Sequence, residues 1–332
     1  MHYNPWTYAD EYLTFVALED GTFTFTPQNN NIINYSTNGG ETWTTGNSVE
    51  VSNGDKVMWK GTMTPATYYG IGTFTSTGNF DVQGNIMSLL HGDNFKGQTD
   101  LTGKSYAFYR LFRNNTKVVS AENLSLPATT LVDNCYANMF IGCTSLINAP
   151  TLPATTLVDY CYYNMFKSCT SLVTAPQLPA TTLADDCYSV MFYGCTSLTT
   201  APELPATTLA DSCYFTMFGN CTSLINTPEL PATTLAKSCY SSMFSDCTSL
   251  VAAPELPATT LVTSCYNNMF NGCTNLNYIK AMFTTTPSSS YTNNWVKNVA
   301  SSGTFVKNSA ATWNVSGVNG VPTGWTIEKT SE

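Results

Sequence analysis

The sequence predicts a mixed α/β fold, in which an N-terminal antiparallel β-sandwich is followed by a solenoid with atypical capping repeats. Residues 10–104 alternate apolar and polar residues in short stretches broken by Gly and Asn turns, which is typical of antiparallel strands. Further along, a Leu-Pro pair recurs every 26 residues from Leu126 to Leu256, and a fixed period of this length indicates stacked repeats. The chain therefore divides into an N-terminal extension (1–9), the sandwich (10–104), the solenoid (105–283, with an N-cap at 105–125 and six repeats at 126–281) and a C-terminal capping region (284–332).

Composition narrows the classes of partner. Only 11% of the residues are charged, the net charge is −9, and no Lys/Arg cluster is present, so we expect no nucleic-acid partner bound through its phosphates. The N-terminal residues lack a basic stretch followed by an apolar one, and no later window is apolar over 18 residues. We therefore expect neither a signal peptide nor a membrane span. Thr, Ser and Asn make up the polar surface, as is common on extracellular and virion proteins.

The sandwich region carries its clearest alternation in the stretches YLTFVAL, GTFTFTP, KVMWKG and GIGTFTSTG. Residues Ser36–Trp43 match the Asp-box pattern, which we interpret as a β-hairpin staple and not as a catalytic element. The remaining enzymatic alternative needs either paired carboxylates in a cleft or His91 oriented by Asp93 towards a nucleophile, and we find no such nucleophile. We therefore expect no enzyme.

Each repeat contains the segment Cys-Tyr-x-x-Met-Phe-x-x-Cys, as in Cys135–Cys143. Its apolar positions at 0, 4, 5 and 8 suit about two turns of helix with one inward face, so a short helical element is expected. The Pro-rich segment that follows holds only short strands, because each proline removes a ladder donor. One repeat should thus form a short strand, a bend and a helical turn, and it must stack on its neighbours to bury its apolar face.

The ends of the repeat array are atypical, as expected for solenoid caps. Residues 107–127 fit the repeat template, with Phe108 in the Tyr column and with Ala107 and Asn115 in the two Cys columns. At the other end, we expect Trp313 and Trp325 to close the open core.

All twelve cysteines fall in two columns, Cys135 to Cys265 and Cys143 to Cys273. Zinc is disfavoured, since structural sites use closely spaced Cys pairs and these thiols would lie roughly 12 Å apart along a helical element. Disulfides between stacked repeats are the alternative, and free thiols that fill narrow core positions are favoured, because Ala107 stands where the first column begins. The Met column beside Phe is likewise interpreted as core. No metal and no cofactor are expected.

Acidic residues form two further columns, one of Asp (Asp133 to Asp211) and one of Glu (Glu203 to Glu255). We interpret the Asp column as helix N-caps, with calcium binding as the alternative.

Two columns vary between repeats, and binding is expected where repeats differ. They are Ala137, Tyr163, Ser189, Phe215, Ser241 and Asn267, and Ile141, Lys167, Tyr193, Gly219, Ser245 and Asn271. If Met-Phe points inwards, both columns share the outward face of the helical element. The candidate ligand-binding residues are Tyr163, Lys167, Tyr193 and Phe215, which would offer flat platforms to sugar rings or protein side chains. Neutral drift at exposed positions is the alternative.

The repeat pattern LPATTLADYCYxxMFxxCTSLxxAPxL resembles the BspA-like leucine-rich repeats of gut Bacteroides proteins and their phages, over about residues 107–283. The segments flanking the repeats also resemble that family. The resemblance implies a curved BspA-type leucine-rich-repeat solenoid that acts in adhesion or ligand binding, without catalysis or cofactor.

Together, these observations predict a non-enzymatic binding or adhesion protein that displays a rigid leucine-rich-repeat surface to a glycan or protein. The expected setting is a phage virion or host-attachment component. The alternatives are a Bacteroides cell-surface adhesin and a purely architectural virion protein. Expected partners lie on a bacterial or virion surface, and a homo-oligomer or virion assembly stays open.

Overall fold

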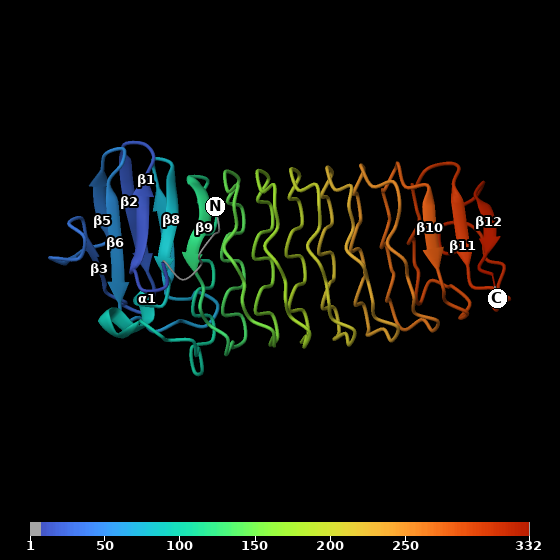
Figure 1. Cartoon of the computed structure of the whole chain (residues 1–332), viewed down its shortest axis with the longest axis horizontal. Coiled ribbons are helices and arrows are strands. Elements are labelled where there is room, and N and C mark those ends of the chain that lie inside the picture. The colour runs from blue at the N-terminus through green and yellow to red at the C-terminus, as the bar shows by residue number, and fades with distance from the viewer. Residues whose placement is uncertain (1–7, 332) are drawn as a thin grey trace.

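The computed structural model describes residues 8–331, so most of the N-terminal extension (1–9) lies outside the described residues. The molecule is elongated, with paired sheets at one end, a stack of repeats along its length and a small sheet at the other end (Figure 1). The fold is β-rich. Its one α-helix among the described residues is α1 (Ser88–His91), followed by the 3₁₀-helix η1 (Gly92–Asn94). The expectation of a mixed α/β fold was therefore wrong.

Two sheets form the N-terminal part. One has the strand order β4-β3-β6-β1-β8-β9 and the other the order β5-β2-β7. Their strands are β1 (Leu13–Ala17), β2 (Gly21–Pro27), β3 (Ile33–Ser36), β4 (Thr44–Thr45), β5 (Ser48–Val51), β6 (Lys56–Gly61), β7 (Gly72–Ser76), β8 (Phe80–Asn85) and β9 (Val118–Ser125). The sheets meet through aromatic side chains: the ring of Phe15 lies 5.4 Å from that of Phe23 and 4.7 Å from that of Phe74. The alternation in GTFTFTP thus buries one face of β2.

The Cys-Tyr-x-x-Met-Phe-x-x-Cys segment is not helical. In the first repeat, the amide of Cys135 donates to the carbonyl of Val132 (3.1 Å), whereas the next amide, of Tyr136, donates to Cys161 in the following repeat (3.0 Å). The alternation continues, because Met139 donates to Tyr136 within the repeat and Phe140 to Met165 in the next. We call this segment, residues 132–143 and its counterparts at steps of 26, the turn ribbon.

A repeating backbone conformation produces the turn ribbon. Every fourth residue has a positive φ, as at Asn134 (59°), Asn138 (59°) and Gly142 (73°). The apolar positions are also spaced by four, so they fit either a helix or this ribbon. A helix would use every amide internally at i→i−4, whereas the ribbon frees every second amide to bond the next repeat. The expected helical element was wrong because those bonds join residues about 25 apart, which a local pattern does not reveal.

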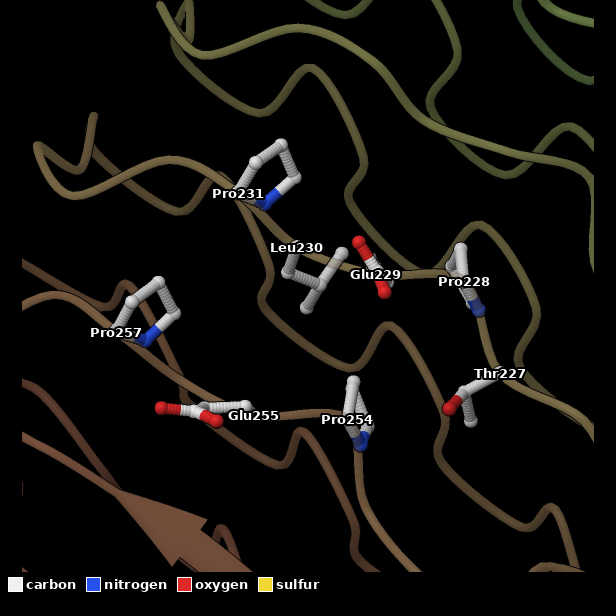
Figure 2. Close-up of a pocket in the computed structure, with 8 residues that line it drawn as sticks. All are labelled: Thr227, Pro228, Glu229, Leu230, Pro231, Pro254, Glu255 and Pro257. Carbon is white, nitrogen blue, oxygen red and sulfur yellow. The ribbon is translucent and has the colours of Figure 1, made fainter.

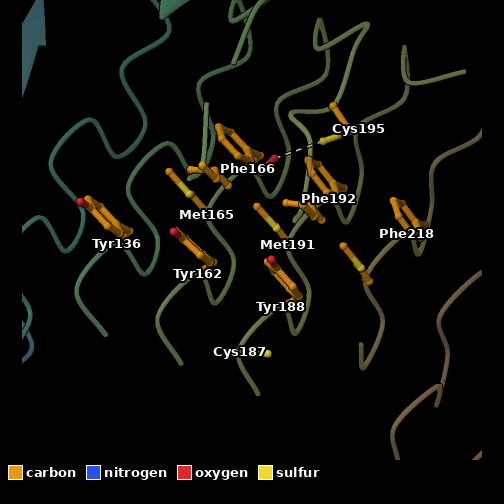
Figure 3. Packing of buried hydrophobic residues seen from close by; sticks show 14 of the residues in the cluster. Tyr136, Tyr162, Met165, Phe166, Cys187, Tyr188, Met191, Phe192, Cys195 and Phe218 are labelled. Carbon is orange, nitrogen blue, oxygen red and sulfur yellow. Dashed lines mark hydrogen bonds between the residues drawn. The ribbon is translucent and has the colours of Figure 1, made fainter. Parts of the chain in front are cut away.

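The inward columns stack as ladders of identical side chains (Figure 3). Tyr136 and Tyr162 lie 5.7 Å apart between ring centroids with nearly parallel planes, and the Phe140 and Phe166 rings lie 5.6 Å apart. The same stacking continues through every repeat to Tyr266 and Phe270. Their rings are almost completely buried, so the repeats share one continuous core.

All twelve cysteines are free, buried thiols. The second-column thiols each donate to a Phe carbonyl of the preceding repeat, as Cys195 does to Phe166 at 3.2 Å (Figure 3). Burial raises the pKa of the first-column thiol of Cys135 to about 12, and burial also raises the pKa of Cys195 well above its ordinary value. These thiols are packing elements that hold neighbouring repeats together.

The Pro-rich segments form only isolated parallel bridges, one residue long. One ladder runs from Ser120 through Asn148 and Thr174 to Thr200 and Asn226. A proline follows two residues after most of these bridges and stops each from lengthening into a strand.

Both ends of the stack are closed. On the N-terminal side, β9 pairs in parallel with β8 and also bridges Asn148, so the sheet of the N-terminal part continues into the repeats. The Phe112 ring lies between those of Phe74 (5.8 Å) and Phe140 (5.1 Å).

On the C-terminal side, a parallel sheet contains β10 (Tyr278–Ala281), β11 (Thr304–Lys307) and β12 (Thr326–Lys329). Trp313 and Trp325 are 5% and 7% exposed and donate from their indole nitrogens to the carbonyls of Phe283 (3.1 Å) and Ala300 (2.7 Å). The expectation that these tryptophans close the core is confirmed.

Candidate binding surface on the turn ribbon

The four candidate residues lie on the outward side of the turn ribbon. Tyr163, Lys167, Tyr193 and Phe215 are all partly exposed, whereas the small residues that share a column with Tyr163, such as Ser189, are buried. The segment is a ribbon and not the expected helix, and its exposure at these columns is uneven, since Ala137, Ser189 and Ser241 are buried. Residues four apart lie on the same side of both structures.

Contacts between repeats hold these side chains in place. The Lys167 ammonium lies 5.3 Å from the centroid of the Tyr193 ring, within the range of a cation–π interaction. Tyr193 in turn lies against Gly219 of the next repeat, where a Cβ would come within 3.0 Å of the ring atom Cδ2. The absence of a side chain at Gly219 therefore makes room for the Tyr193 ring. Three consecutive repeats thus contribute to one surface.

Tyr160 belongs to the same surface and was missed by the sequence reasoning. Its side chain is 40% exposed, and its ring meets that of Tyr163 edge to face at 5.8 Å. Its φ is 57°, in the left-handed region that bulky residues rarely adopt. The sequence feature that could have identified Tyr160 is that it stands at a position where the other repeats have Asn, Asp or Ser. We define the ribbon patch as Tyr160, Tyr163, Lys167, Tyr193 and Phe215.

A second exposed row was also missed. Ile147, Val173, Ile225 and Val251 are 41–56% exposed and stand one residue before the bridge ladder. Each directly follows the buried Leu of the Cys-Thr-Ser-Leu segment, so the alternation of inward and outward side chains was the signal. This row lies on a different segment of the repeat from the ribbon patch.

The Pro-rich segments line a shallow groove (Figure 2). Two hollows of about 420 and 410 Å³ share Thr227, Pro228, Glu229 and Pro231. The carboxylates of Glu229 and Glu255 lie among the prolines of this groove (Figure 2), and that of Glu255 forms an ion pair with Lys280 Nζ at 2.9 Å. Lys280 thus places a positive charge beside the last carboxylate of the Glu column.

The Asp column does not cap helices. The carboxylate of Asp159 instead accepts the backbone amide of Asp185 in the next repeat (3.1 Å), and Asp185 accepts that of Asp211 in the same way (3.0 Å). The N-cap interpretation was wrong because no helix follows, although these carboxylates do satisfy free amides. Within residues 8–331, no three His, Cys, Asp or Glu side chains come together as a metal site.

A polar and aromatic cluster lies on the N-terminal sheets. Asp93 accepts hydrogen bonds from Lys60 Nζ (2.6 Å) and Tyr12 Oη (2.8 Å), and Lys60 lies 4.0 Å above the Trp43 ring. The hydrogen bond from Lys60, then that from Tyr12, lowers the pKa of Asp93, while burial and then Asp93 raise the pKa of Tyr12 to about 12. His91 is partly buried, and burial and then the charge of Lys104 lower its pKa.

The Asp-box segment is a stapled hairpin turn between β3 and β4. Ser36 Oγ accepts the amide of Gly40 (2.9 Å), and Asn38 Oδ1 accepts that of Thr42 (3.1 Å). Trp43, at the end of the box, packs its ring edge to face on Tyr12 at 4.9 Å. The hairpin interpretation of this motif is confirmed.

No protein-family model, no curated protein and no solved structure matches the chain. Among residues 8–331, no helix has the length and apolar character needed to cross a bilayer.

Proposed function

We propose that this protein is a non-enzymatic binding or adhesion protein, built as a BspA-like leucine-rich-repeat stack that presents the ribbon patch to a glycan or protein. The observation that carries the proposal is the ribbon patch, in which four aromatic rings and a lysine from consecutive repeats are exposed or partly exposed on a continuous core. Exposed aromatic side chains supply large contact area at a low cost in conformational entropy.

The stack suits display because its surface is held by ladders of backbone hydrogen bonds and stacked rings. A ligand that binds across several repeats does not have to order a mobile loop, so less free energy is lost on binding. The setting that we propose is a bacterial or virion surface, with a phage host-attachment component first and a Bacteroides surface adhesin second. Thr, Ser and Asn on the exposed segments support this setting.

The test is binding of the fluorescently labelled protein to intact gut Bacteroides cells. We expect saturable binding by the native protein and at least a tenfold loss in the variant Tyr163→Ala/Tyr193→Ala/Phe215→Ala. The matched control is Ile147→Ala/Val173→Ala/Ile225→Ala, which removes exposed apolar side chains from the other row and should bind as the native protein does. Circular dichroism melting curves establish that both variants fold. Equal binding by the native protein and the ribbon variant would contradict the proposal.

A further inference from the structure

We propose that the ribbon patch is one part of a longer aromatic track, which starts on the N-terminal sheets at Tyr68 and binds a linear polysaccharide along the molecular axis. The inference rests on the proposed function of the ribbon patch and names its ligand class. The additional residues of the track are Tyr68, Tyr69 and Tyr106, and the buried Tyr109, only 8% exposed, packs against Tyr106 and supports it.

The N-terminal part of the track joins two regions of the chain. Tyr68 and Tyr69 stand on a tight turn closed by a bridge between Ala66 and Gly70, and they are 64% and 59% exposed. The ring of Tyr68 lies 5.2 Å from that of Tyr106, which belongs to the N-cap of the repeat stack. A Cβ on Gly70 would come within 2.6 Å of the Tyr109 carbonyl oxygen, so this turn packs directly on the first ribbon.

The ribbon then repeats the same aromatic pair two repeats later. The amide of Tyr106 donates to Asp133, as that of Asn134 does to Asp159, so Tyr106, Asn134 and Tyr160 occupy one column. By the same register, a second column contains Tyr109, Ala137 and Tyr163. Both tyrosine pairs meet edge to face, Tyr106 with Tyr109 at 5.4 Å and 81°, and Tyr160 with Tyr163 at 5.8 Å and 72°. Small residues separate the two pairs in each column.

The spacing of the pairs suits a chain of sugars. Equivalent rings in neighbouring repeats of the ribbon lie 5.5 Å (Phe108 and Tyr136) and 5.7 Å (Tyr136 and Tyr162) apart, so pairs two repeats apart are separated by roughly 11 Å. That separation is close to the length of two sugar rings in an extended β-1,4-linked chain. Tyr193 and Phe215 carry the row of rings onward over the next two repeats.

The backbone conformation of three of these tyrosines supports a role for their rings. Tyr68, Tyr106 and Tyr160 have φ values of 65°, 64° and 57°. Asn134 and Ser212 occupy the positions equivalent to Tyr106 and Tyr160 in other repeats, with φ of 59° and 54°, and small polar residues adopt this conformation at less cost. The backbone at these tyrosines is strained, because a bulky residue rarely adopts a positive φ, and such strain is typical of functional positions.

The chemistry of the track favours a polysaccharide over a protein partner. Its rings alternate with polar groups, including the Lys167 ammonium and the Arg110 guanidinium, which lies 4.7 Å from the Tyr109 ring. A pyranose presents an apolar C–H face to a ring and hydroxyl groups to its sides, which matches this alternation. Protein partners bury a more continuous apolar centre surrounded by a polar rim.

The experiment is calorimetric titration of the full chain with β-1,4-linked oligosaccharides of glucose, N-acetylglucosamine, xylose and mannose, from two to eight units long. We expect at least one series to bind, with an affinity that rises at least tenfold from the disaccharide to the octasaccharide. The variants Tyr68→Ala and Tyr160→Asn should each lower the affinity for the octasaccharide at least fivefold. Tyr160→Asn is expected to fold, because Asn134 stands at the equivalent position of the preceding repeat. The control Val173→Ala should bind as the native protein does.

The outcomes separate this inference from the proposed function. Binding that does not change with oligosaccharide length, or that is unaffected by both tyrosine variants, overturns the track. If no oligosaccharide binds while cell binding is still lost in the ribbon variant, the linear-polysaccharide inference fails while the proposed function stands. If neither cells nor oligosaccharides bind, both fail.

Discussion

At the residue scale, cysteine acts in this protein as a small, buried side chain that also donates a weak hydrogen bond. The second-column thiols reach carbonyls of the preceding repeat at 2.9–3.2 Å, as Cys273 does to Phe244 and Cys195 to Phe166. Buried in apolar surroundings, a thiol resists ionisation and so lacks the nucleophilic thiolate. The cysteines therefore contribute packing and not reactivity.

The thiols are accordingly predicted to be unreactive in the folded protein. With 5,5′-dithiobis(2-nitrobenzoate) at pH 8, native protein should release almost no thionitrobenzoate, whereas protein in 6 M guanidinium chloride should release twelve equivalents, one for each cysteine. The physical reason is that burial both blocks access and raises the pKa of thiols such as Cys135 and Cys187 to about 12. Fewer than twelve equivalents after unfolding without reductant would indicate disulfides and contradict the structure.

At the scale of the element, the turn ribbon depends on residues that tolerate a positive φ at every fourth position. Asn138, Asn164 and Asn268 occupy one such column, but Val190 occupies it in the third repeat with φ of 60°. A β-branched side chain is poorly suited to this conformation, which costs roughly 1–2 kcal/mol for residues other than Gly and Asn. Asn164 adds a hydrogen bond to Asn138 Oδ1 at 3.2 Å.

Exchange of these residues should move stability in opposite directions. Val190→Asn relieves the strain and should raise the free energy of unfolding by about 1 kcal/mol, while Asn268→Val should lower it by about 1–2 kcal/mol. The measurement is the urea midpoint followed by circular dichroism. Ser242→Ala, in the same column with φ of 55°, is a control that changes the side chain without adding β-branching. A loss of stability in both exchanges would show that packing, and not backbone conformation, governs the column.

At the scale of the whole molecule, one continuous core runs from the N-terminal sheets to Trp313, and it contains columns of groups that are ionisable but buried. Burial raises the pKa of Cys135 to about 12 and that of Tyr162 well above its ordinary value. In the unfolded chain these groups titrate near about 8.5 for Cys and 10 for Tyr. Their effects accumulate because the columns repeat in every turn of the stack.

The fold is therefore predicted to lose stability steeply at alkaline pH. The pKa values of these buried thiols and phenols are higher in the folded protein than in the unfolded chain. Their contribution to the free energy of unfolding is therefore fully present below about pH 8.5 and is lost as the pH rises towards 12. One pH unit above the unfolded pKa, each thiol should contribute about 1.4 kcal/mol less to the free energy of unfolding than at neutral pH. The summed loss should unfold the stack cooperatively between about pH 9 and 11. The measurement is the urea midpoint as a function of pH.

A single substitution isolates the effect of one thiol. Cys187→Ala removes one titrating group, and Ala107 shows that alanine fits this column at the N-cap. The difference in unfolding free energy between native protein and variant should shrink by about 1.4 kcal/mol between pH 7 and pH 9.5. A difference that stays constant with pH would argue against thiol ionisation as the cause.

Much of the candidate surface was also accessible from the sequence, for a reason that is specific to repeats. A side chain that recurs every 26 residues meets its own copies, so identical columns predict the core, and variable columns predict the surface that holds Tyr163 and Tyr193. Tyr160 was missed because its exposure follows from a left-handed backbone that the helix interpretation did not contain. The contact between Tyr68 and Tyr106 joins a turn of the N-terminal sheets to the stack, and no local pattern records it.

The sequence by itself thus determined the length of the repeat, the residues that face inwards and the closure of the stack by Trp313 and Trp325. Only the tertiary structure decided that the Cys-Tyr-x-x-Met-Phe-x-x-Cys segment is a ribbon and that the Asp column bonds the next repeat. The physical reason is that side-chain burial follows from periodicity along the chain, whereas the partner of a backbone amide depends on what lies beside it in space. Every second amide of the ribbon finds that partner in the next repeat.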